Sequence, residues 1–248
     1  MAPTSIEQSD SMNNVPAHLG IILDGNRRFA RRLMAKPWMG HKWGLEKARE
    51  VLQWACDAGI KYVTAYVLSF ENMSQRPKQE LRYILRYMNE ELDNILGDSN
   101  HVVHRLGVRV RFIGRLGMLP EDMQSRMRQV EKITAGNRRH VLNIAMAYGG
   151  QQEIADAVRQ ILVKGLEGVI KPSDVNETII RHHLYTNGQP YPDVIFRTGG
   201  ERRLSNFLSF QSAYSELIFT DRKWPELSKR DFNAMLREYA RRSRHFGK

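Results

Sequence analysis

Apolar positions along the chain follow two periods, and segments of the two kinds alternate from residue 18 onward. Short runs that are mostly apolar predict buried strands, whereas longer stretches with apolar residues three or four positions apart predict helices. Strands are predicted at 18–23, 60–68, 108–113, 140–147, 193–196 and 216–219. Helices are predicted at 40–58, 77–96, 120–134, 151–164, 175–184 and 229–244.

This alternation predicts an α/β fold, with a single domain built on a central, mostly parallel sheet flanked by helices. In such sheets, ligands bind beyond the carboxyl ends of the strands. Asp24, residues 69–72, Gly149 and Arg197 all come directly after predicted strands. We therefore expect them to meet at one edge of the sheet.

Length and composition indicate one folded unit. A chain of 248 residues can bury one sizeable core, and nothing in the sequence marks a second domain. Residues 1–14 are polar and lack the apolar core of a signal peptide, so we expect a disordered lead-in before one domain at 15–248. The longest apolar runs, such as 63–68, are too short to span a bilayer.

The single cysteine, Cys56, excludes an internal disulfide framework and is typical of a protein in a reducing compartment. It follows the apolar positions of the helix predicted at 40–58, so we expect a buried, unreactive thiol. Together these features predict a cytoplasmic protein.

A net charge of +11 suits nucleic acid, anionic lipid or a phosphorylated substrate. Basic residues gather at 27–36, at 202–203 and at 237–244. The first two clusters lie beside glycines and acids, as a diphosphate site requires, whereas the last is typical of a solvated helix or one that contacts a membrane surface. Neither zinc-ligand spacing, an aromatic RNA-binding strand nor a basic leucine zipper accompanies the charge, so nucleic acid is the weaker alternative.

Two segments carry the candidate chemistry. Residues 18–29 read HLGIILDGNRRF, and residues 197–207 read RTGGERRLSNF. Each places a carboxylate, flexible glycine and several arginines at the end of a predicted strand. Arginine side chains and free backbone amides bind phosphate oxygens, and a carboxylate can hold the Mg²⁺ that accompanies a diphosphate. Two such segments predict a site for two anions.

Together with four further motifs, these segments resemble the cis-prenyltransferases, the undecaprenyl diphosphate synthase family. In the family's order, the motifs are ILDGNRRFA (22–30), GHK (40–42), SFEN (69–72), NIA with YGG (143–150), RTGGE (197–201), RLSNF (203–207) and AYSEL (213–217). The resemblance covers Val15 to the C-terminus and implies that 15–248 is a catalytic domain. It implies a homodimeric, Mg²⁺-dependent transferase that adds isopentenyl diphosphate, in cis, to an allylic diphosphate such as farnesyl or geranylgeranyl diphosphate.

The resemblance also assigns catalytic and metal-binding roles, each with a structural alternative. Asp24 is implied to be catalytic and to bind Mg²⁺, and its alternative is a helix N-cap. Glu216 is implied to complete the metal ligands, and its alternative is an exposed acid at a strand edge. Asn72 is implied to help remove a proton from the isopentenyl unit, and a positioning role is its alternative. His41 is implied to lie near the allylic diphosphate, with capping or packing as its alternative.

Other residues are implied to bind the two substrates. The residues after Asp24 open a helix whose N-terminal amides face the allylic diphosphate. Arg197, Arg203 and Ser205 bind isopentenyl diphosphate, since arginine can pair with phosphate through two hydrogen bonds. The implied substrate-binding set is Gly25, Asn26, Arg27, Arg28, Phe29, His41, Ser69, Phe70, Glu71, Met73, Arg76, Arg197, Arg203, Leu204 and Ser205.

The chain departs from the family pattern at three places. Pro37 stands where the family often has an arginine, four residues before His41. Met73 replaces the usual aromatic residue, and the loop after it is one residue longer, which makes Arg76 the match for its phosphate-binding arginine. Arg202 stands where many members have a histidine proposed as a metal ligand, and a guanidinium cannot bind Mg²⁺.

A growing prenyl chain requires an apolar tunnel, because each added unit exposes surface that water disfavours. In the family the tunnel lies between the sheet and helices, and the helix at 77–96 is its natural wall, although the same apolar stripe fits an ordinary core. Two other functions are open: a non-catalytic partner subunit of the same fold, and a basic nucleic-acid-binding protein. The partner subunit is disfavoured by the presence of Asp24, Asn72, Arg197, Arg203, Ser205 and Glu216.

Overall fold

The computed structural model describes residues 14–242, so most of the predicted lead-in (1–13) and residues 243–248, which include the end of the helix predicted at 229–244, lie outside the described residues. Within residues 14–242, six strands form one parallel sheet in the order β3-β4-β2-β1-β5-β6. The predicted α/β class is confirmed. The strands are β1 (His18–Ile22), β2 (Tyr62–Ser69), β3 (Val108–Ile113), β4 (His140–Tyr148), β5 (Val194–Arg197) and β6 (Glu216–Phe219).

Every predicted strand and helix is present, with small shifts at the ends. Two helices that the sequence analysis did not predict also occur, α3 directly after β2 and α5 directly before β3. They are six and four residues long, too short for an apolar period to show in the sequence. The helices are α1 (Asn26–Arg32), α2 (Met39–Asp57), α3 (Phe70–Gln75), α4 (Lys78–Gly97), α5 (Val102–Arg105), α6 (Glu121–Thr134), α7 (Gly150–Leu166), α8 (Glu177–His183) and α9 (Lys229–Arg241).

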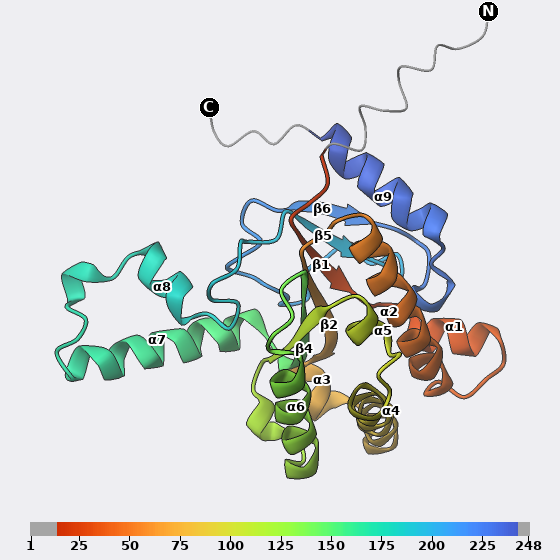
Figure 1. Cartoon of the computed structure of the whole chain (residues 1–248), viewed down its shortest axis with the longest axis horizontal. Helices are drawn as coiled ribbons and strands as arrows, with labels where there is room; N and C mark the ends of the chain where they lie inside the picture. The colour runs from red at the N-terminus through yellow and green to blue at the C-terminus, as the bar shows by residue number, and fades with distance from the viewer. Residues whose placement is uncertain (1–13, 243–248) are drawn as a thin grey trace, which may run out of the picture.

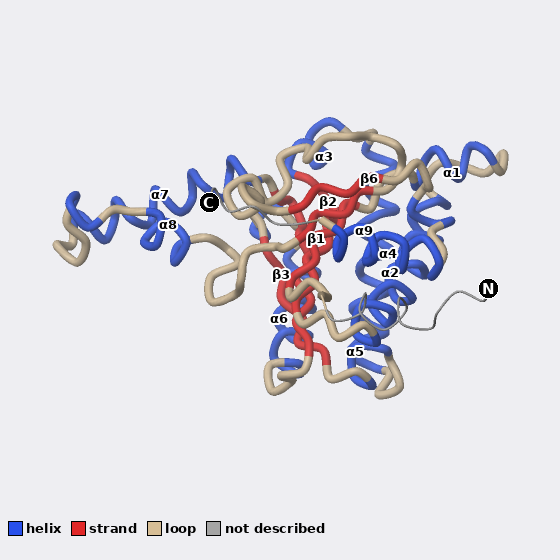
Figure 2. The backbone as a smooth tube through the Cα atoms, turned by 90° about the horizontal axis from the view of Figure 1, so that it is seen from above, coloured by secondary structure: helices blue, strands red, loops and turns tan. Residues whose placement is uncertain are grey.

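The helices lie on both sides of the sheet (Figure 1). Seen from above, α2, α4, α5 and α9 lie on one side of the strands, and α7 and α8 extend away from the body on the other (Figure 2). β1 is central and pairs with β2 and β5, so that Ile22 lies opposite both Tyr66 and Arg197. The segments that follow these three strands therefore meet at one edge of the sheet. They lie beside β1, where the chain changes the direction in which it adds strands to the sheet, and sheets of this kind bind ligands at such a point.

Apolar side chains fill the space between the sheet and the α2 side. Leu19 and Ile21 of β1 pack with Val51 of α2 and Phe232 of α9 in one buried cluster. Cys56 is buried near the end of α2, and burial raises the pKa of its thiol to about 12, with a smaller effect from the neighbouring Asp57. The prediction of a buried thiol is confirmed, and at neutral pH the thiol stays protonated.

An ionic network joins three helices on this side of the sheet. The Nε of Arg49 in α2 donates to the two carboxylate oxygens of Glu91 in α4 at 3.0 and 3.1 Å, and its Nη2 also pairs with Glu91. Glu91 Oε1 lies 3.1 Å from Nε2 of His101, the N-cap residue of α5. We call these three residues the Arg49–Glu91–His101 bridge. It ties α2, α4 and α5 together.

None of the helices within residues 14–242 is both long enough and apolar enough to cross a bilayer. In α9, the guanidinium of Arg241 pairs with Glu238, and Arg242, directly after the helix, pairs with Glu238 and Glu216. A cytoplasmic location, and contact between this basic end of the chain and a membrane surface, stay predictions from the sequence.

Candidate active site

Asp24 lies in the loop that connects β1 to α1. The N-cap of α1 is Gly25, whose φ is 106°, and no side chain caps this helix. The hydroxyl of Thr198 accepts the backbone N–H of Asp24 at 3.1 Å and donates to the Asp24 carbonyl oxygen at 2.8 Å. The alternative that Asp24 is an N-cap is therefore wrong. Main-chain contacts hold the residue in place, and its carboxylate is available to other groups.

One arginine from each of the two predicted segments binds the Asp24 carboxylate. Arg28 Nη2 lies 3.0 Å from Oδ1, and Arg197 Nη2 lies 2.8 Å from Oδ2. The Arg197 side chain is only 5% exposed, and its Nη1 donates to Ser205 Oγ at 2.8 Å and to the carbonyl oxygen of Arg203. Because arginine stays charged at any working pH, this places a permanent buried cation beside Asp24.

Gly199 allows the two segments to approach each other closely. Its φ is 89°, a conformation that favours glycine. A Cβ at this position would lie 2.7 Å from Nη2 of Arg28 and 3.0 Å from the carbonyl group of Asp24. Any larger residue would separate the two arginine segments.

A second group of basic side chains surrounds Glu80 of α4, which is 5% exposed. Its carboxylate pairs with Arg76, with Arg27 Nε at 3.4 Å and with His41 Nε2 at 3.0 Å. Burial alone would raise the pKa of Glu80, but the hydrogen bond from His41 and the charges of Arg76 and Arg27 lower it. Burial lowers the pKa of His41, so its imidazole is neutral at pH 7. Glu80 thus holds two arginines and a neutral histidine at the same edge of the sheet.

The segment after β2 forms α3 and faces the loop after β5. Ser69 caps α3, because its Oγ accepts the backbone N–H of Asn72 at 3.1 Å. Glu71 Oε1 accepts from Nδ2 of Asn206 at 2.8 Å, which joins the two loops. Ser205 and Asn206 have φ values of 50° and 64°, the left-handed region that costs energy for residues with a Cβ. This strained backbone is held in place by its contacts at the site.

These segments enclose an open cleft of about 600 Å³. Its walls carry three arginines but two carboxylates, which favours an anionic ligand. The Nε atoms of Arg76 and Arg197 are buried and have no hydrogen-bond partner within residues 14–242, so both are spare donors for phosphate oxygens. The cleft is lined by Ile22, Leu23, Asp24, Arg27, Tyr66, Val67, Ser69, Glu71, Asn72, Arg76, Arg197, Ser205 and Asn206.

Several predicted site residues do not line the cleft. Arg28 and Arg203 border it through their contacts with Asp24 and Arg197, and His41 borders it through Glu80 and Arg76. Gly25 and Asn26 start α1 beside it. The remaining four face other partners: Phe29 packs on the ring of Trp43, Phe70 lies under the guanidinium of Arg115, and Met73 and Leu204 pack against apolar clusters.

Glu216 also lies away from the cleft. In the parallel pair of β5 and β6, Glu216 is opposite Val194, whereas Phe219 is opposite Arg197. Glu216 is therefore at the other end of the strand, roughly 10 Å along it. Its carboxylate pairs with Nη1 of Arg242 at 3.0 Å. The prediction that Glu216 completes a metal site with Asp24 is wrong within this chain, because the first residue of a parallel strand lies at the amino edge of the sheet.

Metal binding at the cleft would depend on Asp24. Among residues 14–242, His, Cys, Asp and Glu side chains do not form any group of three or more that could hold a metal ion. Mg²⁺ in phosphate sites is usually bound by one or two carboxylates, with the other ligands from phosphate and water. The donor set therefore fits a Mg²⁺ ion that arrives with a diphosphate, and does not fit an ion held by protein ligands alone.

Two apolar cavities of about 80 Å³ each adjoin the cleft on the α2 and α4 side of the sheet. Leu23 and Val67 line the cleft and both cavities, so the three spaces meet at these two residues. One of the two cavities is lined by apolar residues of α2, α4, α5 and the central strands. A charged cleft that leads to apolar space fits a ligand with an anionic head and a long apolar tail.

Four residues that shape the cleft, Thr198, Asn206, Glu80 and Tyr66, are not among those predicted from the sequence. Thr198 and Asn206 lie inside the motifs RTGGE and RLSNF, so these motifs could have indicated both residues. Glu80 lies one helical turn after Arg76, which is the spacing of an ion pair on a helix surface. The hydroxyl of Tyr66 donates to the carbonyl oxygens of Tyr148 and Ser205 at 3.2 Å, a contact that no local pattern indicates.

Residues 22–247 match the family model described as "Putative undecaprenyl diphosphate synthase". The chain belongs to the undecaprenyl diphosphate synthase family. It is 45% identical over 235 residues to the Thermococcus kodakarensis protein named tritrans,polycis-undecaprenyl-diphosphate synthase (geranylgeranyl-diphosphate specific), covering 95% of this chain and 88% of the relative. It is 46% identical over 239 residues to an isoprenyl transferase of Thermus thermophilus, covering 94% of this chain and 89% of the relative.

Solved structures show the same fold. Lavandulyl diphosphate synthase from Lavandula x intermedia, in complex with dimethylallyl diphosphate, matches with a TM-score of 0.89 and 31% identity over 94% of this chain and 99% of that one. A probable undecaprenyl diphosphate synthase from Campylobacter jejuni matches with a TM-score of 0.77 and 28% identity over 95% and 100% of the two chains. The protein is thus a cis-prenyltransferase, an enzyme that condenses isopentenyl diphosphate with an allylic diphosphate.

For this cis-prenyltransferase we expect Asp24→Asn to lower kcat by about a hundredfold, the scale of losing one preorganised electrostatic group. The amide keeps the volume and one acceptor, but it leaves the buried Arg197 guanidinium without its carboxylate partner, so we expect a folded variant with a lower melting temperature. Glu201→Gln is the matched control, since Glu201 also pairs with Arg28, at 3.5 Å, but does not line the cleft. Steady-state kinetics and thermal melting of both variants test the assignment, and near-normal turnover of Asp24→Asn would contradict it.

Proposed function

We propose that this cis-prenyltransferase extends geranylgeranyl diphosphate with isopentenyl diphosphate units, in the presence of Mg²⁺, to a long Z-polyprenyl diphosphate. The single observation that supports this best is the position of Asp24, between Arg28 and Arg197 and beside the entry to the apolar cavities. The choice of primer follows the relatives at 40–45% identity, whose names include geranylgeranyl-diphosphate specificity.

The chemistry needs separate support for two diphosphates. The C–O bond of the allylic substrate breaks and releases diphosphate, and the double bond of isopentenyl diphosphate supplies the electron pair for the new C–C bond. The proton that the isopentenyl unit then loses would pass to an oxygen of the released diphosphate. Bond breaking is easier when the leaving diphosphate is neutralised, which Arg27, Arg28 and Arg76 would do. Arg197 and Arg203 would hold the second diphosphate, with Ser205 as a further donor. Asn72 lines the cleft and would position the isopentenyl unit.

Asp24 is the residue that would hold Mg²⁺, together with diphosphate oxygens and water. When bound, the ion adds positive charge to the diphosphate oxygens. Asp24 already balances the charges of Arg28 and Arg197. The side chain therefore links the two arginine segments.

The apolar cavities would receive the prenyl tail. Leu23 and Val67 stand where cleft and cavities meet, and Met88 of α4 lines both cavities. Burying an alkene chain there removes apolar surface from water, at about 25 cal/mol per Å². The proposed tunnel would start at Leu23 and Val67 and continue between α2 and α4.

The direct test is incubation of the purified chain with labelled isopentenyl diphosphate and Mg²⁺, with either geranylgeranyl or farnesyl diphosphate as primer. We expect incorporation with both and several-fold faster incorporation with geranylgeranyl diphosphate, and we expect a strong chelator to abolish the reaction until Mg²⁺ is restored. Absence of any labelled polyprenyl product would refute the function. Equal rates in chelator and in Mg²⁺ would refute only the role of the metal.

The arginine segments make a separate prediction about substrate binding. Arg197→Ala should raise the KM for isopentenyl diphosphate by about tenfold or more, because a charged hydrogen bond is worth about 1.5–3 kcal/mol. Arg28→Ala should instead raise the KM for the allylic substrate. Arg31→Ala, an exposed arginine of the same helix α1, is the control and should change neither value. If Arg28→Ala and Arg197→Ala shift the same KM, the two segments do not bind different substrates.

We also propose that the enzyme is a homodimer, joined through the arm that α7 and α8 form (Figure 1). The arm carries apolar side chains that face solvent in the single chain, among them Leu162 at 63% and Leu166 at 91% exposure. Leu162→Asp should therefore raise the fraction of monomer in sedimentation velocity, whereas Leu33→Asp on the C-cap of α1, which is 52% exposed, should not. A monomeric unmodified protein, or equal effects of the two variants, would contradict this interface.

A further inference from the structure

The segment that joins α1 to α2 carries apolar side chains that face water. We call residues 31–38 the α1–α2 loop. It lies at the end of the molecule opposite the arm of α7 and α8 (Figure 1, Figure 2). Leu33 is 52% exposed and Met34 is 97% exposed. Met34 also has a φ of 53°, a region that favours glycine, asparagine or aspartate. The fold of the single chain therefore does not explain a methionine at this position.

The same loop is strongly basic. Residues 25–45 contain six arginines and lysines and no acidic residue. Arg32 pairs with Glu226. Arg31 and Lys36 are both exposed, and no ion pair within residues 14–242 involves either of them. The loop thus combines exposed positive charge with exposed apolar surface.

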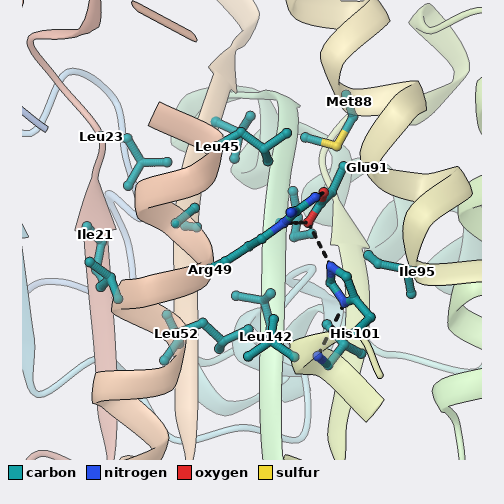
Figure 3. A pocket seen from close by; sticks show the side chains of 18 of the residues that line it. Ile21, Leu23, Leu45, Arg49, Leu52, Met88, Glu91, Ile95, His101 and Leu142 are labelled. Atoms are coloured by element: carbon teal, nitrogen blue, oxygen red, sulfur yellow. Dashed lines mark hydrogen bonds and ion pairs between the residues drawn. The ribbon is translucent and has the colours of Figure 1, made fainter. Parts of the chain in front are cut away.

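Aromatic side chains connect the loop with the apolar cavities. The ring of Trp38 stacks on Tyr83 of α4 with centroids 4.9 Å apart, and Tyr83 lies 6.2 Å from Tyr87, which lines one of the two cavities. Leu45 of α2 and Met88 of α4, labelled in Figure 3, line both cavities. Tryptophan and tyrosine are enriched at bilayer interfaces, because each has an apolar ring and a polar group. The surface at the loop therefore continues to the space proposed for the prenyl chain.

We propose that the α1–α2 loop docks on an anionic lipid bilayer. Leu33 and Met34 enter the headgroup region, where their apolar surface leaves water, and Arg31 and Lys36 contact the anionic head groups. A second copy of the chain fits the loop less well, because a two-fold contact would bring the same positive charges together. Nucleic acid also fits less well, because it offers the two apolar side chains no apolar surroundings at its phosphates.

Docking at this loop brings the start of α2 and Tyr83 of α4 next to the lipid. A long prenyl diphosphate, with an anionic head and an apolar tail, then has a bilayer beside the helices that flank its cavity. This consequence rests on the proposed function, whereas the docking itself needs neither substrate nor reaction. Failure of the prenyl-transfer assay would therefore leave the docking measurements unaffected.

The test is co-sedimentation of the full chain with vesicles of phosphatidylcholine alone, or of equal parts phosphatidylcholine and phosphatidylglycerol. We expect several-fold tighter binding to the anionic vesicles. Met34→Asp should weaken this binding about tenfold, because it removes apolar contact and adds a charge that the lipid repels. Aspartate tolerates the backbone at this position, so the melting temperature should not fall. Met118→Asp is the matched control, since Met118 is 45% exposed between β3 and α6.

A second variant tests the charges. Arg31→Ala/Lys36→Ala should weaken binding to anionic vesicles severalfold at low salt and less at high salt, because ions screen exposed charges. Arg128→Ala/Lys132→Ala, which removes one exposed arginine and one exposed lysine of α6, is the matched control and should bind like the unmodified protein.

Three results would overturn the inference. The first is that the unmodified protein does not bind vesicles, or that Met34→Asp binds as it does. The second is that only the charge variant binds more weakly, since the loop would then suit any polyanion, nucleic acid included. The third is that Met34→Asp raises the fraction of monomer in sedimentation velocity, since the loop would then join two copies of the chain.

A fluorescent label gives an independent measurement. Because Cys56 is buried, only the introduced thiol of Met34→Cys should react with an environment-sensitive fluorophore. Its emission should shift to shorter wavelength when anionic vesicles are added, whereas the same label in Met118→Cys should not respond. Equal responses at the two positions would show that the protein meets the bilayer without a preference for the loop, and the inference would be wrong.

Discussion

A single buried guanidinium holds the two halves of the active site together. Arg197 ends β5 and Asp24 follows β1, and the pair meets at 2.8 Å although the residues are 173 positions apart in the chain. The guanidinium of Arg197 is almost inaccessible to water, and burying this charge is costly unless it is paired and hydrogen-bonded. Asp24, Ser205 and the carbonyl oxygen of Arg203 provide these partners, so the burial of Arg197 requires all three groups to lie around it. The approach of the two loops at Gly199 and the position of Arg28 follow from this one contact.

The fold could be predicted from sequence because buried parallel strands are short apolar runs and helices carry a stripe with a longer period. The same logic located Asp24, Asn72 and Arg197, since each follows a strand and parallel strands end at a common edge. Glu216 was selected instead by the family resemblance, and because it begins its strand, the sheet carries it to the opposite edge. The position of a residue within a strand decides which edge it serves, and a motif alone does not state that position.

The parts that sequence did not indicate depend on three-dimensional neighbours. Glu80 reads as one of many charges on an amphipathic helix, and its role appears only when Arg27 and His41 arrive from other segments. The apolar stripe of α4 packs in the core and also lines a cavity, and the sequence does not distinguish the two roles. Met88 and Leu92, for example, each belong to the packed core and each line the apolar cavity. Likewise, the basic end of the chain looks like a free charged surface, whereas Arg242 is paired with Glu216 and Glu238.

The wide separation of Asp24 and Arg197 along the chain has a consequence for folding. The cleft cannot exist until β5 has docked against β1, so the N-terminal three quarters of the chain contain the acid and its helix but not their buried counter-ion. Substrates that bind only the completed cleft would stabilise the native state by mass action, in proportion to the logarithm of their concentration over the dissociation constant. Diphosphate supply and the population of folded enzyme are therefore thermodynamically linked, and a nascent chain becomes competent for substrate only near the end of its synthesis.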